Sequence, residues 1–295
     1  MKHKRQKRIG MKRHMFLLPV FLVAVVAFVL VAAAPNSWAR GWRHHDDDGH
    51  DDGVEQPFKD AEFFIEYNST AGDTGVQVFL DDDNWRRITI SDPNDKPLFS
   101  VKGETTLGRQ GLTELFFESV EPELADLSLV DFLDRFPEGD YEFEGNRNDG
   151  IELESEVEFT HVIPCGPEVL PEEGTVLDPE SGVVISWAEV EEVVDPVATD
   201  AAEETVCTDP KDLKQKLEID IYQVIVENDD IHLIVDLTSD DRSLTVPPEL
   251  LEDNTLYIFE VLAKEESGNQ TITEGFFCTG PDLSQGECME LFEAL

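Results

Sequence analysis

The feature that most constrains this chain is a strict alternation of apolar and acidic residues. It is clearest over residues 151–159, where glutamate occupies every second position from Glu152 to Glu158 and the positions between are mostly apolar. Side chains of a strand point to opposite faces in turn, so this pattern predicts a strand with one buried and one solvated face. Shorter runs with apolar residues at every second position cover residues 62–67, 76–80, 88–90 and 114–118. The chain is therefore expected to be all-β.

These runs predict a first antiparallel β-sandwich domain over residues 57–162, which we assign to no family. Residues 148–150, Asn-Asp-Gly, are turn formers, and they predict a hairpin that joins residues 141–144 to the strand at 151–159. One short helix is expected at residues 129–136, because Ser128 can cap its start and Pro137 can stop it.

The N-terminus predicts export. Residues 1–14 contain seven Lys or Arg and no acid, an uncharged run covers residues 15–34, and small residues at Ser37 and Ala39 precede a cleavage point. This is the layout of a signal peptide over residues 1–39. The apolar run is also long enough for an uncleaved anchor, and cleavage is the favoured alternative. We expect a secreted, periplasmic or cell-surface protein that touches the membrane only through this segment, if it is kept.

Two terminal stretches are expected outside the folded domains. Residues 40–56 are rich in His, Asp and Gly and predict a disordered linker, and residues 281–295 form a C-terminal tail. The charge balance excludes one class of partner. The chain has 65 Asp and Glu against 22 Lys and Arg, a net charge of −43, and such a surface repels nucleic acid.

The chain has four cysteines, Cys165, Cys207, Cys278 and Cys288. An even number in an exported chain predicts disulfides, and three pairings are open. No Cys-x-x-Cys spacing occurs, which argues against structural zinc.

Residues 165–280 carry the pattern of a second β domain. Val183–Trp187 is an apolar strand that ends in tryptophan, and Tyr222–Val226 is a further strand. Leu251 lies six residues before Tyr257, and Val261 follows four residues after it. These segments resemble the second, third and tyrosine-corner strands of a fibronectin type III module, and residues 271–277 would be its last strand. The whole layout resembles secreted bacterial proteins with one such module.

The resemblance implies an immunoglobulin-like sandwich of seven strands that serves as a spacer or binding module and is rarely an enzyme. The sequence departs from the family in one place, a long acidic insertion over Glu189–Leu217 that contains Cys207. In the resembled fold this loop lies at the pole where the domain begins, near Cys165. The resemblance therefore implies the pairs Cys165–Cys207 and Cys278–Cys288.

Signals for catalysis are weak. The sequence has no Gly-x-Ser-x-Gly and no His-Glu-x-x-His, and only His161 and His232 lie in the predicted domains. We expect a protein that is not an enzyme. A carboxylate-based hydrolase is the less favoured alternative, because 65 acids make chance pairs common.

Asp81, Asp82 and Asp83 follow a predicted strand and offer hard oxygen ligands for calcium. We expect no other cofactor. The alternative is a plain turn, for which aspartate is equally common. Calcium binding here would give a calcium-stabilised, adhesin-like module.

Five cations lie between residues 85 and 109, and only three acids oppose them there. Trp85, Arg86, Arg87 and Arg109 are typical interface residues, and the tryptophan could stack on a sugar. Internal pairing with nearby acids is the alternative. The sequence predicts an exported, non-catalytic binding or adhesion protein whose partner is an extracellular or envelope protein or glycan.

Overall fold

The computed structural model describes residues 55–202 and 204–294. The predicted signal peptide and most of the predicted linker lie outside these residues. The last two linker residues, Glu55–Gln56, form strand β1, which pairs in parallel with Glu152–Leu153. Among the described residues, none of the helices has the length and hydropathy of a membrane span.

The N-terminal half is built around one long strand. Its elements are β2 (Asp60–Asn68), β3 (Asp73–Ser91), β4 (Pro97–Lys102), α1 (Thr105–Gln110), β5 (Leu112–Glu118), α2 (Leu129–Leu133), β6 (Gly139–Arg147) and β7 (Glu152–Phe159). The first part of β3 pairs with β2 and β5, and its second part pairs with β6 and β4. The register shifts between Asp81 and Trp85, where Asn84 has a positive φ of 58°. This irregularity lets one strand serve two pairings in succession.

The alternating pattern places the core of this half as expected. Phe63, Ile65 and Tyr67 of β2 are buried, and they pack with apolar residues of β3, β6, β7 and α2 in one cluster. The predicted helix begins where expected, because the Ser128 side chain accepts a hydrogen bond from the Asp131 amide. It ends at Leu133, three residues earlier than predicted. The predicted hairpin is present as β6 and β7.

The C-terminal half has its own core. Its strands form two small sheets and also extend the large sheet. Its strands are β8 (Val169–Leu170), β9 (Thr175–Leu177), β10 (Val183–Trp187), β11 (Val193–Val194), β12 (Cys207–Thr208), β13 (Ile219–Glu227), β14 (His232–Thr238), β15 (Ser243–Val246), β16 (Thr255–Glu265) and β17 (Gln270–Thr279), with helices α3 (Pro196–Ala202) and α4 (Gln285–Phe292). The order β8–β10–β15 faces the order β14–β13–β16–β17. Between them lies a cluster that includes Trp187, Tyr222 and Phe259.

This half has the fibronectin type III arrangement that the resemblance implies. Seven of its strands follow that arrangement: β8, β10 and β15 form a three-stranded sheet, and β14, β13, β16 and β17 are consecutive strands of the twelve-stranded sheet. The Tyr257 hydroxyl accepts a hydrogen bond from the Glu252 amide at 2.8 Å and lies 3.4 Å from the Leu250 carbonyl, to which it donates. A tyrosine that hydrogen-bonds back to the backbone at this corner is a hallmark of such sandwiches.

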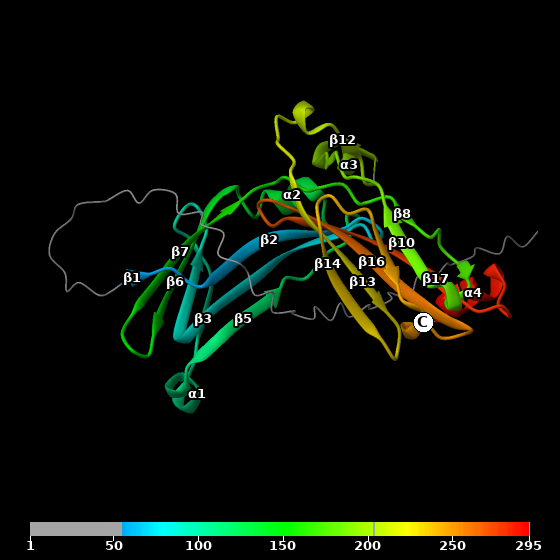
Figure 1. The fold of residues 1–295 in the computed structure, drawn as a ribbon. Helices are drawn as coiled ribbons and strands as arrows, with labels where there is room; N and C mark the ends of the chain where they lie inside the picture. Colours follow the sequence, from blue (N-terminus) through cyan, green and yellow to red (C-terminus); the bar gives the residue numbers. More distant parts are fainter. Residues whose placement is uncertain (1–54, 203, 295) are drawn as a thin grey trace, which may run out of the picture. The chain divides into compact units, whose positions relative to one another are not determined.

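The two halves share one sheet, which Figure 1 shows passing from β3 and β2 into β17 and β16. Residues Gln270–Ile272 of β17 pair in parallel with Glu66–Asn68 of β2. The other end of β17 pairs in parallel with β9. The prediction of purely antiparallel sheets is therefore wrong at these two pairings and at β1–β7. Parallel neighbours cannot be joined by a hairpin, and these strands meet through distant parts of the chain.

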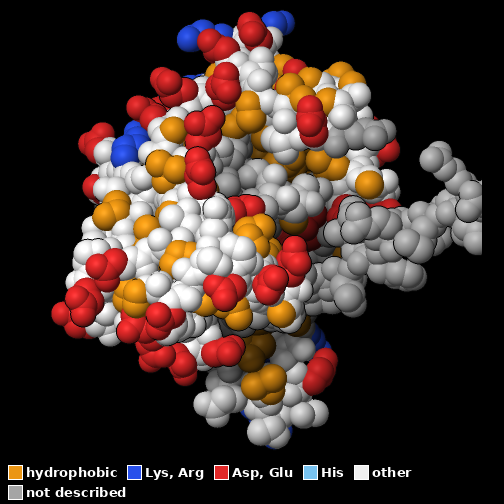
Figure 2. All heavy atoms as spheres, turned by 90° about the vertical axis from the view of Figure 1, so that its right-hand side faces the viewer, with side chains coloured by type: hydrophobic (Ala, Val, Ile, Leu, Met, Phe, Trp, Pro, Cys, Tyr) orange, Lys and Arg blue, Asp and Glu red, His pale blue; other side chains and the backbone are white. Residues whose placement is uncertain are grey.

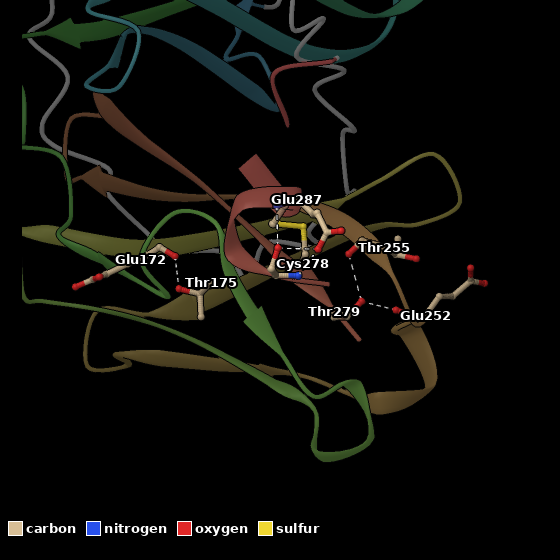
Figure 3. The surroundings of a disulfide bond; sticks show 9 residues. Glu172, Thr175, Glu252, Thr255, Cys278, Thr279 and Glu287 are labelled. Atoms are coloured by element: carbon tan, nitrogen blue, oxygen red, sulfur yellow. Dashed lines mark hydrogen bonds between the residues drawn. A yellow bond between two sulfur atoms is a disulfide. The ribbon is translucent and has the colours of Figure 1, made fainter. Parts of the chain in front are cut away.

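Two disulfides join Cys165 to Cys207 and Cys278 to Cys288, the pairing that the resemblance implies. The second attaches α4 to the end of β17 (Figure 3). The predicted C-terminal tail is thus largely helical. Ser284 and Glu287 form a capping box at the start of α4, and the Phe292 ring stacks on Phe276 with centroids 4.0 Å apart.

Candidate binding site

The structure separates Trp85 from the arginines that follow it. Trp85 is only 1% exposed and belongs to the N-terminal core, and its indole nitrogen has no hydrogen-bond partner among the described residues. The prediction that this ring stacks on a sugar at the surface is therefore wrong. A second register shift, between Trp85 and Arg87, accounts for the difference. It leaves both Arg86 and Arg87 exposed, although neighbours in a regular strand point to opposite faces.

We call Arg86, Arg87 and Arg109 the arginine surface. Arg109 lies in α1, and the loop that carries α1 is fastened to β3, because the Gly103 amide donates to the Arg86 carbonyl at 2.8 Å. A Cβ atom at Gly108 would lie 2.2 Å from the Gly103 carbonyl oxygen, so glycine is required for this close approach. Lys102 of β4 lies directly opposite Arg87. Like charges at opposed positions destabilise a sheet unless an anion lies near them.

The three arginines of the arginine surface form no ion pair with any residue that the structure describes, although Arg109 donates a 3.4 Å hydrogen bond to Thr106. Six described Lys and Arg side chains form no ion pair with a described residue: Arg86, Arg87, Lys96, Arg109, Arg135 and Lys214. Four of the six fall between residues 86 and 109. Carboxylates are not scarce in the chain, which has 65 Asp and Glu against 22 Lys and Arg. Figure 2 shows Asp and Glu spread over the face that it draws. Of the cations between residues 86 and 109, Lys102 alone forms an ion pair with a described residue, Glu104, at 3.1 Å.

Arg87 also lines a hollow of about 310 Å³ on the outer side of β3, β6 and β7. Thr89 and Asn146 line it as well, and Glu144 and Glu154 supply carboxylates. A hydrogen bond with the Glu55 carboxyl, together with partial burial, raises the pKa of Glu154 to about 7. The hollow thus offers a guanidinium, an amide, a hydroxyl and carboxyls, which are groups that bind the polar edge of a sugar or peptide.

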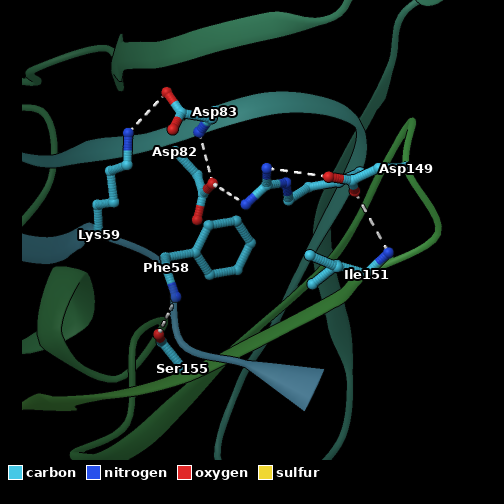
Figure 4. A network of polar contacts seen from close by, with 8 residues as sticks. Phe58, Lys59, Asp82, Asp83, Asp149, Ile151 and Ser155 are labelled. Atoms are coloured by element: carbon cyan, nitrogen blue, oxygen red, sulfur yellow. Dashed lines mark hydrogen bonds and ion pairs between the residues drawn. The ribbon is translucent and has the colours of Figure 1, made fainter. Parts of the chain in front are cut away.

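The three aspartates predicted to bind calcium lie within β3 and do not converge on one point. Asp82 is buried and lies 3.7 Å from the Arg147 guanidinium, and Asp83 pairs with Lys59 at 2.6 Å (Figure 4). These contacts pair two of the three carboxylates with cations of the chain. Over the two described ranges, no group of three or more His, Cys, Asp or Glu side chains is arranged to hold a metal ion.

Both histidines of the folded region are held by hydrogen bonds. His161 Nε2 lies 2.7 Å from the Phe136 carbonyl oxygen, and His232 Nδ1 lies 2.8 Å from a carboxylate oxygen of Glu227. All four cysteines are in disulfides. Each histidine ring is therefore held in place by a hydrogen bond.

A group of carboxyls lies on the outer face of the shared sheet, and no local sequence pattern predicted it. Glu66 of β2 is 6% exposed, and the Gln270 side chain of β17 donates a hydrogen bond to it. Burial raises the pKa of Glu66 to about 7, and burial together with Glu66 and its acidic neighbours raises the pKa of Glu121 to about 9. Burial and Glu274 likewise raise the pKa of Asp73 to about 6 and that of Glu260 to about 8.

No protein-family model and no curated protein sequence matches the chain. Solved structures that match include the chicken CNTN1 FN1–FN3 domains, with 11% identity, a TM-score of 0.29 and coverage of 77% of this chain and 65% of that one. A tetra-tandem repeat in the extending region of a large adhesion protein matches at 11% identity and a TM-score of 0.25, covering 74% of this chain and 50% of that one.

A segment of two fibronectin type III domains from chicken tenascin matches at 9% identity and a TM-score of 0.24, covering 75% of this chain and 98% of that one. The chain therefore spans less than two thirds of the first two structures. TM-scores this low carry no argument about function. The fibronectin type III-like fold rests on the strand order and on the hydrogen bonds of Tyr257.

Proposed function

We propose that this chain is an exported, non-catalytic binding protein of the adhesion or adaptor type. It recognises a protein or glycan of the cell envelope or matrix through the arginine surface. The partner supplies carboxylate or sulfate groups to Arg86, Arg87 and Arg109, and the hollow beside Arg87 accommodates the polar edge of a sugar or peptide.

The observation that carries the proposal is the lack of ion-pair partners for these arginines among the described residues of a strongly acidic chain. Arginine is enriched at interfaces because its planar guanidinium binds anions through two parallel hydrogen bonds. A rigid β scaffold that presents such side chains at a strand irregularity and a short helix suits recognition.

The disulfides support export. Two disulfides persist in oxidising compartments and are rare in the cytosol. A large negative charge keeps a protein soluble and separate from other acidic surfaces, so that a local patch of cations directs binding.

The test is binding of the purified chain to an array of neutral, carboxylated and sulfated glycans and to immobilised matrix proteins. Arg86→Glu, Arg87→Glu and Arg109→Glu are combined in one variant. The matched control combines Arg135→Glu, Lys211→Glu and Lys214→Glu, which changes the net charge equally. We expect wild-type binding to an anionic member, a loss of about tenfold or more in the first variant and little change in the control. Equal binding by all three proteins, or no binding to any member, contradicts the proposal.

A further inference from the structure

A groove of about 710 Å³ lies between the acidic insertion and the C-terminal sandwich. The insertion, Glu189–Leu217, forms one wall. The start of β13 and the turn between β14 and β15 form the other. The volume falls within the range of about 300–1,000 Å³ that is typical of ligand sites. The groove is separate from the arginine surface, because all its lining residues belong to the C-terminal half.

The insertion is held firmly against the sandwich. The disulfide fixes Cys207 to Cys165 at the start of the domain, and the Val190 amide donates a 3.1 Å hydrogen bond to the buried Tyr222 hydroxyl. Val193 also forms a backbone bridge with Pro164. The groove is therefore preformed, which lowers the entropic cost of binding an extended ligand.

The cations in the groove walls are already occupied. The Arg242 guanidinium pairs with Glu189 at 3.2 Å and lies 5.2 Å from the centre of the Tyr222 ring. Lys216 pairs with Glu218 at 2.5 Å, and Lys211 lies 3.7 Å from Asp209. Lys216 also pairs with Glu266 at 3.4 Å, so each of the three cations is engaged by at least one carboxylate.

Three acids of the groove remain without an ion pair or a side-chain hydrogen bond among the described residues. Glu191, Glu192 and Asp240 are exposed, and all three line the groove. Gln215 lines it too, and its side-chain oxygen accepts no hydrogen bond from a described residue. The groove thus combines negative charge with apolar side chains such as Leu217 and Ile219.

We propose that this groove binds a short, extended peptide segment of a partner protein that carries Lys or Arg next to apolar residues. The basic side chains pair with Glu191, Glu192 and Asp240, and the apolar side chains pack on Leu217 and Ile219. Exclusion of water from the apolar contacts distinguishes such a segment from a small polyamine, which satisfies only the charges. This site goes beyond the proposed function, because it requires nothing of the arginine surface.

The experiment is calorimetry on the purified chain with a capped hexapeptide of alternating Lys and Leu. The comparison ligands are the Glu–Leu hexapeptide, a Lys–Ser hexapeptide and spermidine. We expect the Lys–Leu peptide to bind at least tenfold more tightly than each of the other three. Equal affinity for spermidine or the Lys–Ser peptide would show charge attraction alone and overturn the proposal.

Variants locate the binding. Glu191→Gln, Glu192→Gln and Asp240→Asn together should weaken the Lys–Leu peptide about tenfold, since each exposed pair contributes a fraction of that factor. The control combines Glu249→Gln, Asp282→Asn and Glu290→Gln, which removes the same charge from exposed positions elsewhere. An equal loss in the control would assign the affinity to the overall charge of −43 and contradict the groove.

A further variant changes no charge. Ser239 lines the groove, and its side chain forms no hydrogen bond with a described residue. Ser239→Trp should fill the groove and weaken the peptide at least tenfold while leaving the melting temperature near that of wild type. Unchanged binding by this variant would overturn the proposal even if the acidic variant failed to fold.

Discussion

The side-chain oxygen of Asn269 accepts a 2.8 Å hydrogen bond from the backbone amide of Ile65, 204 residues away in the sequence. The amide nitrogen of the same side chain donates to the carbonyl oxygens of Thr160 and Val162, each at 3.0 Å. Asn269 is 1% exposed. One buried side chain therefore holds β2, the connection between the halves and the start of β17 in register.

Asn269→Ala should destabilise the whole chain. It leaves the Ile65 amide and two carbonyls unsatisfied in a buried place, which we expect to cost about 3 kcal/mol of unfolding free energy. Urea denaturation measures this cost. Asn94→Ala, at an exposed turn, is the control and should change little. A loss below about 1 kcal/mol for Asn269→Ala would show that water replaces these hydrogen bonds.

Stability should fall as the pH rises through neutrality. The pKa of Glu66 is about 7 in the folded chain against 4.5 for an ordinary glutamate, so the folded state binds more protons between these values. The stabilisation is complete below about pH 4.5 and is lost as the pH rises through 7. Asp73, Glu121 and Glu260, with raised pKa values, act in the same direction.

Glu66→Gln isolates this effect, because it keeps an acceptor for Gln270 and removes the charge. We expect the variant to be more stable than wild type at pH 8, by about 3 kcal/mol at most, and close to wild type at pH 4.5. Thermal unfolding over this range measures the difference. Glu249→Gln, at an exposed position, should show no such trend. A constant difference at all pH values would contradict the burial of a titrating carboxyl.

The two disulfides should differ in their contribution. Cys165–Cys207 closes a loop with a sequence separation of 42, and Cys278–Cys288 closes one of 10. On the chain-entropy model their loss costs about 4 and about 3 kcal/mol. Denaturation of the paired serine variants, Cys165→Ser with Cys207→Ser and Cys278→Ser with Cys288→Ser, measures both. A larger loss for the shorter loop would show that the packing of α4 outweighs loop entropy.

Asp200 should stabilise a helix in the other half of the chain. Its carboxylate, in α3 of the insertion, accepts hydrogen bonds from the Leu129 and Val130 amides at 2.7 and 3.1 Å, at the first turn of α2. Asp200→Ala should cost about 1 kcal/mol, and Asp200→Asn should recover part of it by keeping one acceptor. Equal losses in the two variants would assign the effect to charge alone.

Much of this fold could be predicted from local patterns. Alternation predicted which faces of β2 and β7 are buried. The spacing around Tyr257 carried the resemblance to a fibronectin type III module, and that resemblance implied the disulfide pairing. Ser128 marked the start of α2. Each of these signals depends on residues close together in the sequence, or on a fold whose geometry is general.

The remaining features depend on long-range contacts. Trp85 is adjacent to two exposed arginines, and only the register shift in β3, set by its pairing with β6, turns its ring into the core. Glu66 occupies a position that alternation assigns to solvent, yet β17 covers it from about 200 residues away. The helix α4 had a local signal, the Ser284 and Glu287 capping box, which the assignment of a tail overlooked.

The pairing of β17 on its outer side also bears on modularity. A strand at the edge of a sheet leaves the backbone groups of its far side unpaired. Here β2 occupies one end of that side and β9 the other, so the last strand of the module is an interior strand of the whole. Separating the two halves would expose the unpaired N–H and C=O groups of β17 where β2 now pairs, and these groups could then pair with a strand of another chain. The C-terminal half therefore shares its backbone hydrogen bonding with the N-terminal half and is not an independent module.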